Sequence, residues 1–383
     1  MVTRIPGPRE LWRRLVDPID PVLFGLLALL LVYALMVLAS ATNDFIGRFY
    51  NQLVNLGVAL VVMRVAAQIP PQRLMHLALP AYIGGLLLLV AVALFGDVSK
   101  GARRWLDLGV TRIQPSEIMK IAMPLMLAWY FQRHEALLRW KDYVIAAVIL
   151  AVPVLLIAKQ PDLGTAILVL ASGFFVIFLA GLSWKLILPV ALAGVIGVGA
   201  LVAFEGEICQ PEVQWPLLKE YQKHRVCTLL DPGSDPLGKG FHTIQSTIAL
   251  GSGGVLGKGW FKGSQTHLEF LPERHTDFIF AVLAEEFGLV GNAFLLVLYA
   301  LFIGRALMIA ANAPTLFSRL LGGSIALIFF TYAFVNMGMV SGILPVVGVP
   351  LPFVSYGGTA LVTLMLGVGI LMSINRHRML VQK

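Results

Sequence analysis

The chain has 383 residues, of which 58% are hydrophobic and only 13% are charged. This composition excludes an ordinary soluble domain and indicates a polytopic membrane protein. The net charge of +8 does not point to nucleic acid, because the cytoplasmic loops of membrane proteins are themselves rich in Lys and Arg. We therefore expect no nucleic-acid partner.

Ten stretches of the chain are long and apolar enough to predict membrane-spanning helices, and the predicted fold class is all-α. A helix needs about 20 mostly apolar residues to cross a bilayer. The predicted spans are residues 21–41, 52–67, 77–95, 116–131, 143–158, 163–180, 186–204, 278–304, 320–344 and 354–374. The first is expected to be a true span, because it is long and lacks the small-residue cleavage site of a signal peptide.

Basic residues predict the orientation. An even number of spans places both termini on one side, and the short loops on that side hold many more bases than acids, which predicts a cytoplasmic location. The predicted organisation is a cytoplasmic segment 1–20, seven spans within 21–204, one long periplasmic loop 205–274, three spans within 275–376 and a cytoplasmic tail 377–383.

The loop 96–115 departs from this charge rule. It is predicted to lie outside, yet it carries Lys100, Arg103, Arg104 and Arg112. Such a cluster predicts an anionic ligand; the alternative is an ordinary solvated loop.

The long loop 205–274 contains several local signals. Residues 241–250 alternate apolar and polar side chains at helical spacing, which predicts a short helix at the membrane surface. The glycine-rich run 251–259 resembles a phosphate-binding loop but lacks the required Gly and Ser or Thr at two positions, so a flexible turn is the expected structure.

Asp277 is the predicted centre of the chemistry. The sequence Glu273-Arg-His-Thr-Asp277 leads directly into an apolar helix, and a carboxylate at the mouth of a span is costly to desolvate. Ala281 and Ala284 share a helical face with Asp277 and leave space above it. The alternative is that Asp277 only caps the helix.

Other polar residues interrupt the apolar stretches. Glu117 and Lys120 are three apart on one face of a span, which predicts either a structural ion pair or a polar cavity. Asp162, between the fifth and sixth spans, either caps the sixth helix or faces a cavity. The Gly- and Pro-rich segment 336–358, with Ser355, predicts irregular backbone that lines a cavity or forms a structural loop.

Taken together, these motifs resemble the SEDS family (shape, elongation, division and sporulation proteins), most closely its cell-elongation member. The resemblance covers nearly the whole chain, except the insert near 207–216. The segments that carry it are 100–106, 114–120, 160–165, 235–238, 245–246, 251–254, 270–280 and 352–358.

The resemblance implies a peptidoglycan glycosyltransferase that polymerises lipid II at the outer face of the bacterial plasma membrane. It implies a class B penicillin-binding protein, a transpeptidase of the elongation machinery, as partner. The family's essential aspartate falls on Asp277, which would act as general base in an inverting mechanism. Lys100, Arg103, Arg104 and Arg274 are the candidates for binding the diphosphate.

The remaining candidate residues are polar groups expected to line a cavity. They are Glu117, Lys120, Asp162, Gln245, Ser246, Glu285 and Ser355. No cofactor is required by the sequence, and a divalent cation (Mg²⁺ or Mn²⁺) stays open because no ligand cluster specifies one. The alternatives to the enzyme are a lipid II flippase and a non-catalytic scaffold for a transpeptidase.

Cys209 and Cys227 are the two cysteines of the chain. Both fall in the loop predicted to lie outside, where the compartment permits oxidation, so we expect a disulfide. Two free buried thiols are the alternative.

Overall fold

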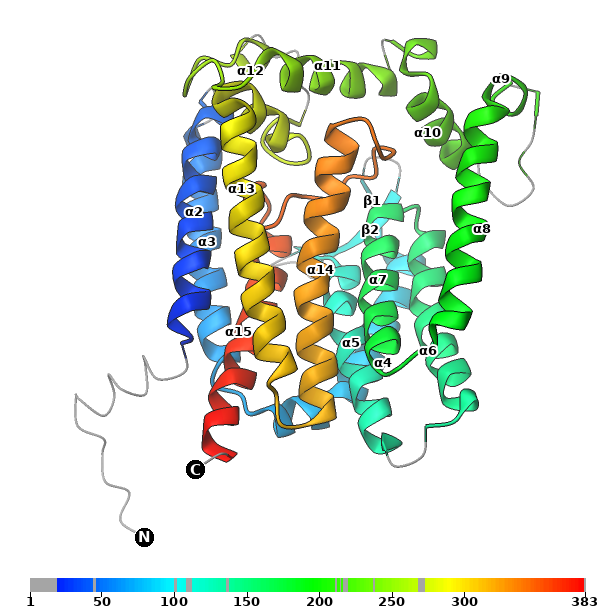
Figure 1. The fold of residues 1–383 in the computed structure, drawn as a ribbon, viewed down its shortest axis with the longest axis vertical. Coiled ribbons are helices and arrows are strands. Elements are labelled where there is room, and N and C mark those ends of the chain that lie inside the picture. Colours follow the sequence, from blue (N-terminus) through cyan, green and yellow to red (C-terminus); the bar gives the residue numbers. More distant parts are fainter. Residues whose placement is uncertain are drawn as a thin grey trace, which may run out of the picture.

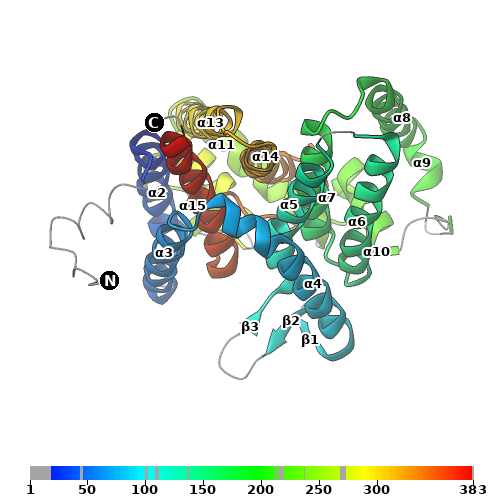
Figure 2. The same cartoon turned by 90° about the horizontal axis from the view of Figure 1, so that it is seen from below.

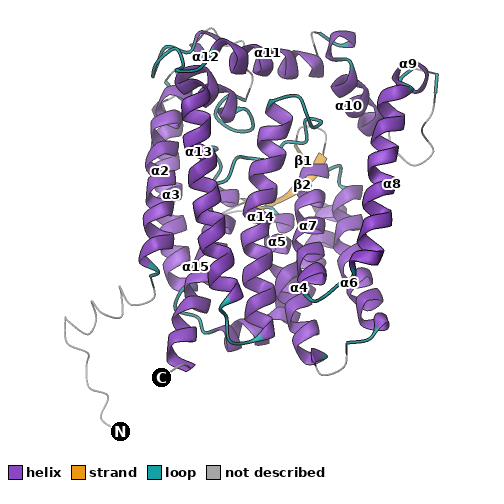
Figure 3. Cartoon of the chain, in the orientation of Figure 1, coloured by secondary structure: helices purple, strands orange, loops and turns teal. Residues whose placement is uncertain are grey.

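Long helices run side by side through the molecule, and shorter elements cross one end of the bundle (Figures 1 and 3). The computed structural model describes residues 19–43, 46–99, 102–107, 112–135, 138–210, 212–213, 215, 220–236, 238–267 and 273–381. The long helices are α2 (Pro21–Ala41), α3 (Ile46–Ala66), α4 (Pro71–Phe95), α5 (Pro115–Arg133), α6 (Trp140–Lys159), α7 (Leu163–Leu179), α8 (Trp184–Ala203), α13 (Ile279–Ala311), α14 (Leu316–Val340) and α15 (Gly358–Val381).

Each of the ten predicted spans overlaps one of these helices, which confirms the helical membrane fold. Within the described residues, eight helices have the length and apolar composition to cross a membrane. The other two are α7, a shorter apolar helix, and α5, which carries Glu117, Lys120 and Arg133. The charged residues lower the hydropathy of α5, yet α5 is a helix whose residues are mostly buried.

Asp20 shows how the sequence sets one end of the bundle. Its carboxylate accepts a hydrogen bond from the backbone N–H of Leu23 at 2.7 Å, and Pro21 follows it at the first helical position. Such a cap satisfies one of the open N–H groups of a helix start. The same carboxylate binds Arg305 at 2.6 Å and Asn375 at 3.0 Å, so it joins α2 to α13 and α15.

The centre of the bundle is α14, whose residues are mostly buried and which packs against α5, α7, α13 and α15. In contrast, α8 has no buried residue. Seen along the helices, α8 lies at the periphery beside α6 and α7 (Figure 2).

A small sheet, which the sequence did not predict, lies in the segment between α4 and α5. Its strands are β1 (Asp97–Ser99), β2 (Ala102–Asp107) and β3 (Arg112–Ile113), all antiparallel in the order β1-β2-β3. The strands are short and two adjacent arginines interrupt the alternation of β2, so the period-2 signal is weak. The fold is therefore nearly, but not wholly, all-α.

The segment between α8 and α13 lies across one end of the bundle, here named the α11 end (Figure 1). It contains α9 (Glu205–Ile208), α10 (Glu220–Leu230), the 3₁₀ turn η2 (Pro232–Ser234), α11 (Lys239–Ser252) and α12 (Ser264–His267). α11 covers the helix predicted at 241–250. The start of α2 and the end of α15 lie at the opposite end of the bundle.

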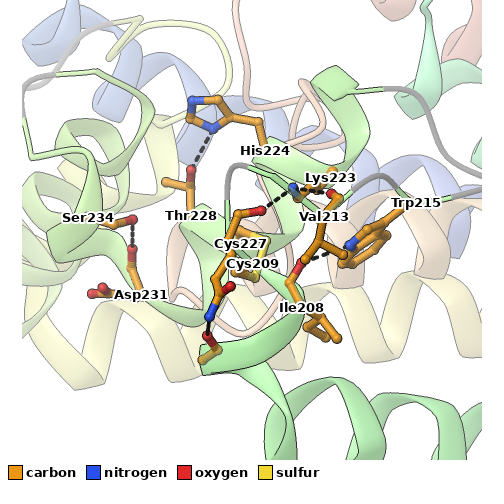
Figure 4. Close-up of a disulfide and its surroundings, with 12 residues drawn as sticks. Ile208, Cys209, Val213, Trp215, Lys223, His224, Cys227, Thr228, Asp231 and Ser234 are labelled. Carbon is orange, nitrogen blue, oxygen red and sulfur yellow. Dashed lines mark hydrogen bonds between the residues drawn. A yellow bond between two sulfur atoms is a disulfide. The ribbon is translucent and has the colours of Figure 1, made fainter.

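A disulfide joins Cys209, just after α9, to Cys227 in α10, with a Cα–Cα distance of 5.6 Å (Figure 4). Lys223 lies one turn before Cys227 and donates to the backbone carbonyls of Gln210 and Val213 at 2.7 and 2.6 Å. Trp215 donates to the carbonyl of Ile208 at 3.0 Å. The bridge and the bonds of Lys223 fasten the segment near 207–216, which the resemblance did not cover, to α10.

Candidate active site

A cavity of about 350 Å³ lies at the α11 end of the bundle, and Asp277 is one of its lining residues. Five elements enclose it: β2, α10, α11, the segment just before α13 and the loop after α14. The lining residues are Arg104, Arg225, Thr228, Leu229, His242, Thr243, Glu273, Asp277, Phe278 and Pro345 to Gly348. This size and mixture of polar and apolar side chains is that of a small-molecule site.

The backbone at Asp277 is held from α14. Asn336 is fully buried and donates from Nδ2 to the carbonyl of Asp277 at 2.8 Å and to that of Val349 at 2.7 Å. Gly348 lies beside the carboxylate, and a β-carbon at this glycine would lie 3.4 Å from Oδ2 of Asp277. Gly348 also has φ of +72°, which a residue with a side chain rarely adopts.

Asp277 does not cap the helix that follows it. The cap residue of α13 is Phe278, and no side chain bonds to the helix start there. Asp277 therefore lines the cavity and does not act as the cap of this helix.

The segment before Asp277 is fixed by the Pro-rich segment after α14. Ser355 donates from Oγ to the carbonyl of Thr276 at 2.6 Å and accepts from the N–H of Leu351 at 2.8 Å. The N–H of Tyr356 donates to the carbonyl of His275 at 2.8 Å. Ser355 thus positions the backbone segment that carries Asp277. It is not among the residues that line the cavity.

Two arginines bring positive charge to the cavity from opposite elements. Arg104 of β2 donates from Nη2 to the carbonyl of Pro161 at 2.8 Å, and its buried Nε has no partner among the described residues. Arg225 of α10 donates from Nη1 to the carbonyl of Val346 at 2.8 Å. Each guanidinium is oriented by one backbone carbonyl, and a guanidinium with its five N–H groups is well suited to bind an anion.

The other predicted bases fall elsewhere. Arg274 is buried and donates from Nε to the carbonyl of Ala41 at the end of α2, so the prediction that it lines the anion site is not met by this cavity. Lys100 and the side chain of Arg103 lie outside the described residues.

His242 of α11 is a site residue that the sequence analysis did not select. Its ring stacks on that of Phe278 with centroids 5.6 Å apart and planes at 21°. Burial lowers the pKa of His242, and the negative charge of Glu273 opposes this shift in part. The imidazole is therefore neutral near pH 7, and its Nδ1 is buried without a hydrogen-bond partner among the described residues.

Glu117 and Lys120 form a buried ion pair away from the cavity. Lys120 Nζ lies 2.5 Å from Glu117 Oε1 and also 2.5 Å from the hydroxyl of Tyr332 on α14. The structure therefore shows the structural ion pair rather than a polar cavity, and the hydroxyl of Tyr332 is its third member. The pair joins α5 to α14 and does not line the site.

The remaining predicted cavity residues also have structural partners. Asp162 caps α7 through the N–H of Thr165 at 3.3 Å and accepts from Gln114 at 3.1 Å. Ser246 is fully buried and donates to the carbonyl of Val340 at 2.9 Å, which joins α11 to α14.

Glu285 is fully buried in an ion pair with Lys258 at 2.7 Å, and Gln245 is only half-buried. Across the described residues, none of the seven predicted polar residues lines the cavity at Asp277. Spacing identifies a polar residue in an apolar helix, but it does not give the direction in which that residue finds its partner.

No group of three or more His, Cys, Asp or Glu that could hold a metal ion occurs among the residues that the structure describes. Asp277 and Glu273 are the two acids at the cavity. A cation at this site would therefore depend on these carboxylates together with oxygen atoms of a ligand.

Comparison with known proteins identifies the chain's relatives. The family described as "Cell cycle protein", which groups FtsW, RodA and SpoVE, matches residues 18–380. The chain is 53% identical over 382 residues to "Peptidoglycan glycosyltransferase MrdB" of Escherichia coli K12, with 100% of both chains covered. It is 32% identical to "Peptidoglycan glycosyltransferase RodA" of Treponema pallidum, over 93% of this chain and 97% of the relative.

Two solved structures share the fold. One, described as "Structural coordination of polymerization and crosslinking by a peptidoglycan synthase complex", matches with a TM-score of 0.76 and 37% identity over 94% of this chain and 98% of the other. The crystal structure of the rod shape determining protein RodA from Thermus thermophilus matches with a TM-score of 0.68 and 30% identity, over 94% and 97%. The chain therefore belongs to the SEDS family, the group of FtsW, RodA and SpoVE.

Proposed function

We propose that this chain polymerises lipid II into glycan strands, with Asp277 as the general base of an inverting transfer. Relatives that match its whole length are named peptidoglycan glycosyltransferases, and the chain is an enzyme of that class. The observation that carries the residue assignment is a carboxylate that lines a cavity together with two arginines.

The chemistry requires a base and an anion site. Lipid II carries its disaccharide through an α-linked diphosphate, and a β-1,4 bond inverts that anomeric centre. In a direct displacement, Asp277 accepts the proton of the acceptor 4-hydroxyl while that oxygen attacks the anomeric carbon. The bond to the diphosphate breaks, and the polyprenyl diphosphate leaves with the electron pair.

Arg104 and Arg225 are suited to the leaving diphosphate. Both line the cavity, and both have a backbone carbonyl as a fixed partner at 2.8 Å. Positive groups held in place before the reaction stabilise charge as it develops, at no cost of reorganisation. His242, neutral and stacked on Phe278, offers a ring nitrogen to a sugar hydroxyl rather than a charge to the phosphate.

The orientation proposed for the membrane follows from the same site. Lipid II is polymerised at the outer face of the plasma membrane, so in this proposal the α11 end, with Asp277 and the disulfide, faces the periplasm from a plasma (inner) membrane. Both ends of the chain then lie on the cytoplasmic side. A disulfide between Cys209 and Cys227 agrees with an oxidising compartment.

A transpeptidase partner is also part of the proposal. One solved relative is described as a complex that coordinates polymerisation and crosslinking. A class B penicillin-binding protein of the elongation machinery would cross-link the strands that this chain makes.

The test uses the purified full-length protein with lipid II and measures glycan polymer on gels. Asp277→Asn keeps the size of the side chain and removes its basicity, so polymer should be lost while the protein remains folded. Thr276→Ala is a matched control on the neighbouring residue. Normal polymer from Asp277→Asn would remove this residue from the mechanism; lipid II that crossed liposome membranes without any polymer would favour a flippase.

A further inference from the structure

The α13 helix is interrupted at Gly288, and a loop from elsewhere in the chain fills the interruption. Gly288 has φ of 63° and ψ of −158°, a backbone conformation that is not helical. Since α13 has lost its regular ladder at this point, its backbone groups need other partners. They find them in residues 254–259, just after α11.

Four backbone hydrogen bonds join the loop to the interruption. Lys258 and Gly259 donate to the carbonyls of Glu285 and Glu286 at 3.0 and 2.9 Å. In the reverse direction, the N–H groups of Leu289 and Val290 donate to the carbonyls of Gly254 and Val255 at 3.0 and 3.1 Å. The loop thus provides hydrogen-bond partners for backbone carbonyls at the end of the first helical piece and for backbone N–H groups at the start of the second.

The fit depends on glycine. A β-carbon at Gly257 would lie 2.1 Å from the carbonyl oxygen of Glu286, and one at Gly253 would lie 2.0 Å from that of Ala284. These distances are too short for any side chain, because the atoms that it would meet belong to the backbone of α13. The glycine-rich run that resembled a phosphate loop in the sequence is therefore a backbone-to-backbone contact.

A buried ion pair between Glu285 and Lys258 lies in this contact. Glu285 has no exposed surface, and its Oε1 accepts from Lys258 Nζ at 2.7 Å, from Ser264 Oγ at 3.0 Å and from the N–H of Gln265 at 3.0 Å. An ion pair with further hydrogen bonds is the form in which a carboxylate and an ammonium tolerate an apolar environment.

The loop lies inward from the α11 end of the bundle, at the level of the long helices. Trp260 donates from Nε1 to the carbonyl of Met36, which is five residues from the end of α2. At 1.5 Å per residue this is about 7 Å inward. α2 has 21 residues, a length of about 31 Å that just matches the apolar core of a bilayer.

The side chains that the loop turns outward are apolar. Val255, Leu256 and Trp260 are 63%, 79% and 47% exposed. They adjoin exposed apolar residues of the two neighbouring spans: Met36 of α2 at 40%, and Leu289 of α13 at 62%. Exposed apolar side chains of α2, the loop and α13 therefore occupy neighbouring positions, because Trp260 is bonded to Met36 and Val255 to Val290.

We propose that residues 253–261 form a re-entrant loop that is inserted in the bilayer leaflet on the α11 side, with Val255, Leu256 and Trp260 in contact with lipid. Irregular backbone is tolerated at membrane depth only when its polar groups are paired, and the interruption at Gly288 supplies that pairing. The position of Trp260 fits the aromatic belt near the membrane interface. The loop follows α11 directly, so its insertion fixes the depth of the helix that brings His242 to the site.

The chain is well suited to a test by spin labelling. Its two cysteines are joined in the disulfide, so an introduced cysteine is the one free thiol for a nitroxide label. Leu256→Cys is the test variant, Leu289→Cys is the control for a lipid-facing site, and Ser234→Cys in the exposed turn η2 is the control for water. The full-length protein is studied in lipid nanodiscs without any partner protein.

Oxygen concentrates in lipid, so it should relax the label at 256 more than a water-soluble nickel chelate does. The label at 289 should give the same order. The label at 234 should be relaxed more by the nickel chelate than by oxygen. A label at 256 that behaves like the one at 234 would place the loop in water and overturn the proposal. Low collision with both reagents would mean that protein covers the loop, which also overturns it. If Leu256→Cys does not fold, Val255→Cys carries the same test.

Discussion

Asn336 of α14 donates a hydrogen bond to the backbone carbonyl of Asp277, a residue 59 positions earlier in the chain. The same amide nitrogen reaches the carbonyl of Val349, so a buried side chain joins the two segments that meet beside the carboxylate. The position of Asp277 in the cavity therefore depends on a residue that does not line it.

Asn336→Ala should lower the turnover number of glycan synthesis more than it raises KM for lipid II. Loss of the amide leaves two buried carbonyls unpaired, which costs about 1–3 kcal/mol for each group, and lets the backbone of Asp277 shift. The measurement is polymerase kinetics with purified protein. Asn312→Ala is the control, because Asn312 makes a similar bond to Met308 at the exposed end of α13. Equal kinetics of the two variants would contradict the positioning role.

Arg104→Gln should weaken polymerisation, and the loss should grow when the lipid II concentration is lowered. Arg104 lines the cavity of Asp277 and removal of its charge leaves the diphosphate with less compensation. Arg103→Gln on the same strand is measured beside it, because Arg103 is also a candidate for the diphosphate. If both variants reduce only the amount of inserted protein, with turnover per molecule unchanged, the bases of this segment serve topology instead.

Lys120→Met should strongly destabilise the protein, by roughly 3–5 kcal/mol, because it leaves Glu117 as a buried charge without its cation. The double variant Glu117→Leu with Lys120→Met should recover much of that stability, because both charges are then removed. Thermal unfolding in detergent measures both. If the double variant were as unstable as the sum of Lys120→Met and Glu117→Leu measured separately, the two residues would act independently.

Replacing Cys209 and Cys227 together by serine should lower stability while polymer synthesis is retained. The two residues are 18 positions apart, and closing a loop of that length contributes about 3 kcal/mol in the chain-entropy model. Mass spectrometry after blocking free thiols first establishes that the unreduced wild-type protein takes up no blocking group. Complete loss of catalysis by a folded serine variant would mean that the bridge shapes the cavity.

His242 should make the protein less stable as the pH falls. Burial lowers its pKa in the folded protein, whereas the unfolded chain titrates near its usual value of about 6.5. Below that pH the unfolded state binds more protons, so the free energy of unfolding decreases with falling pH. His242→Gln should therefore lose less thermal stability between pH 7.5 and 5.5 than the wild type. An identical loss in both proteins would exclude this residue as the cause.

The ten spans could be predicted because each is an apolar stretch of the right length, and this signal is local. The ion pair of Glu117 with Lys120 was also visible, since the two lie one helical turn apart. Tyr332, its third member, lies 212 positions from Lys120, and nothing in the sequence connects them.

Two features were hidden for the same reason. Gly288 reads as a glycine tolerated inside an apolar helix, and its interruption becomes stable only because the loop at 254–259 is there to pair with it. Likewise Asp277 could be singled out from its place at the mouth of a span, but Arg225 and His242 could not be assigned to it. They approach it through the packing of α10 and α11, which local patterns do not encode.

The isolation of α8 has a consequence for how this protein tolerates change. Its residues Trp184–Ala203 bury no side chain within the bundle, so beyond the contact of the Trp184 ring with Phe178 shape complementarity restrains them little. Apolar side chains of different sizes should replace one another along α8 in a saturation library with little effect on growth, whereas in α14 even a single methylene should matter. In evolutionary terms, α8 should drift in identity while it conserves hydrophobicity.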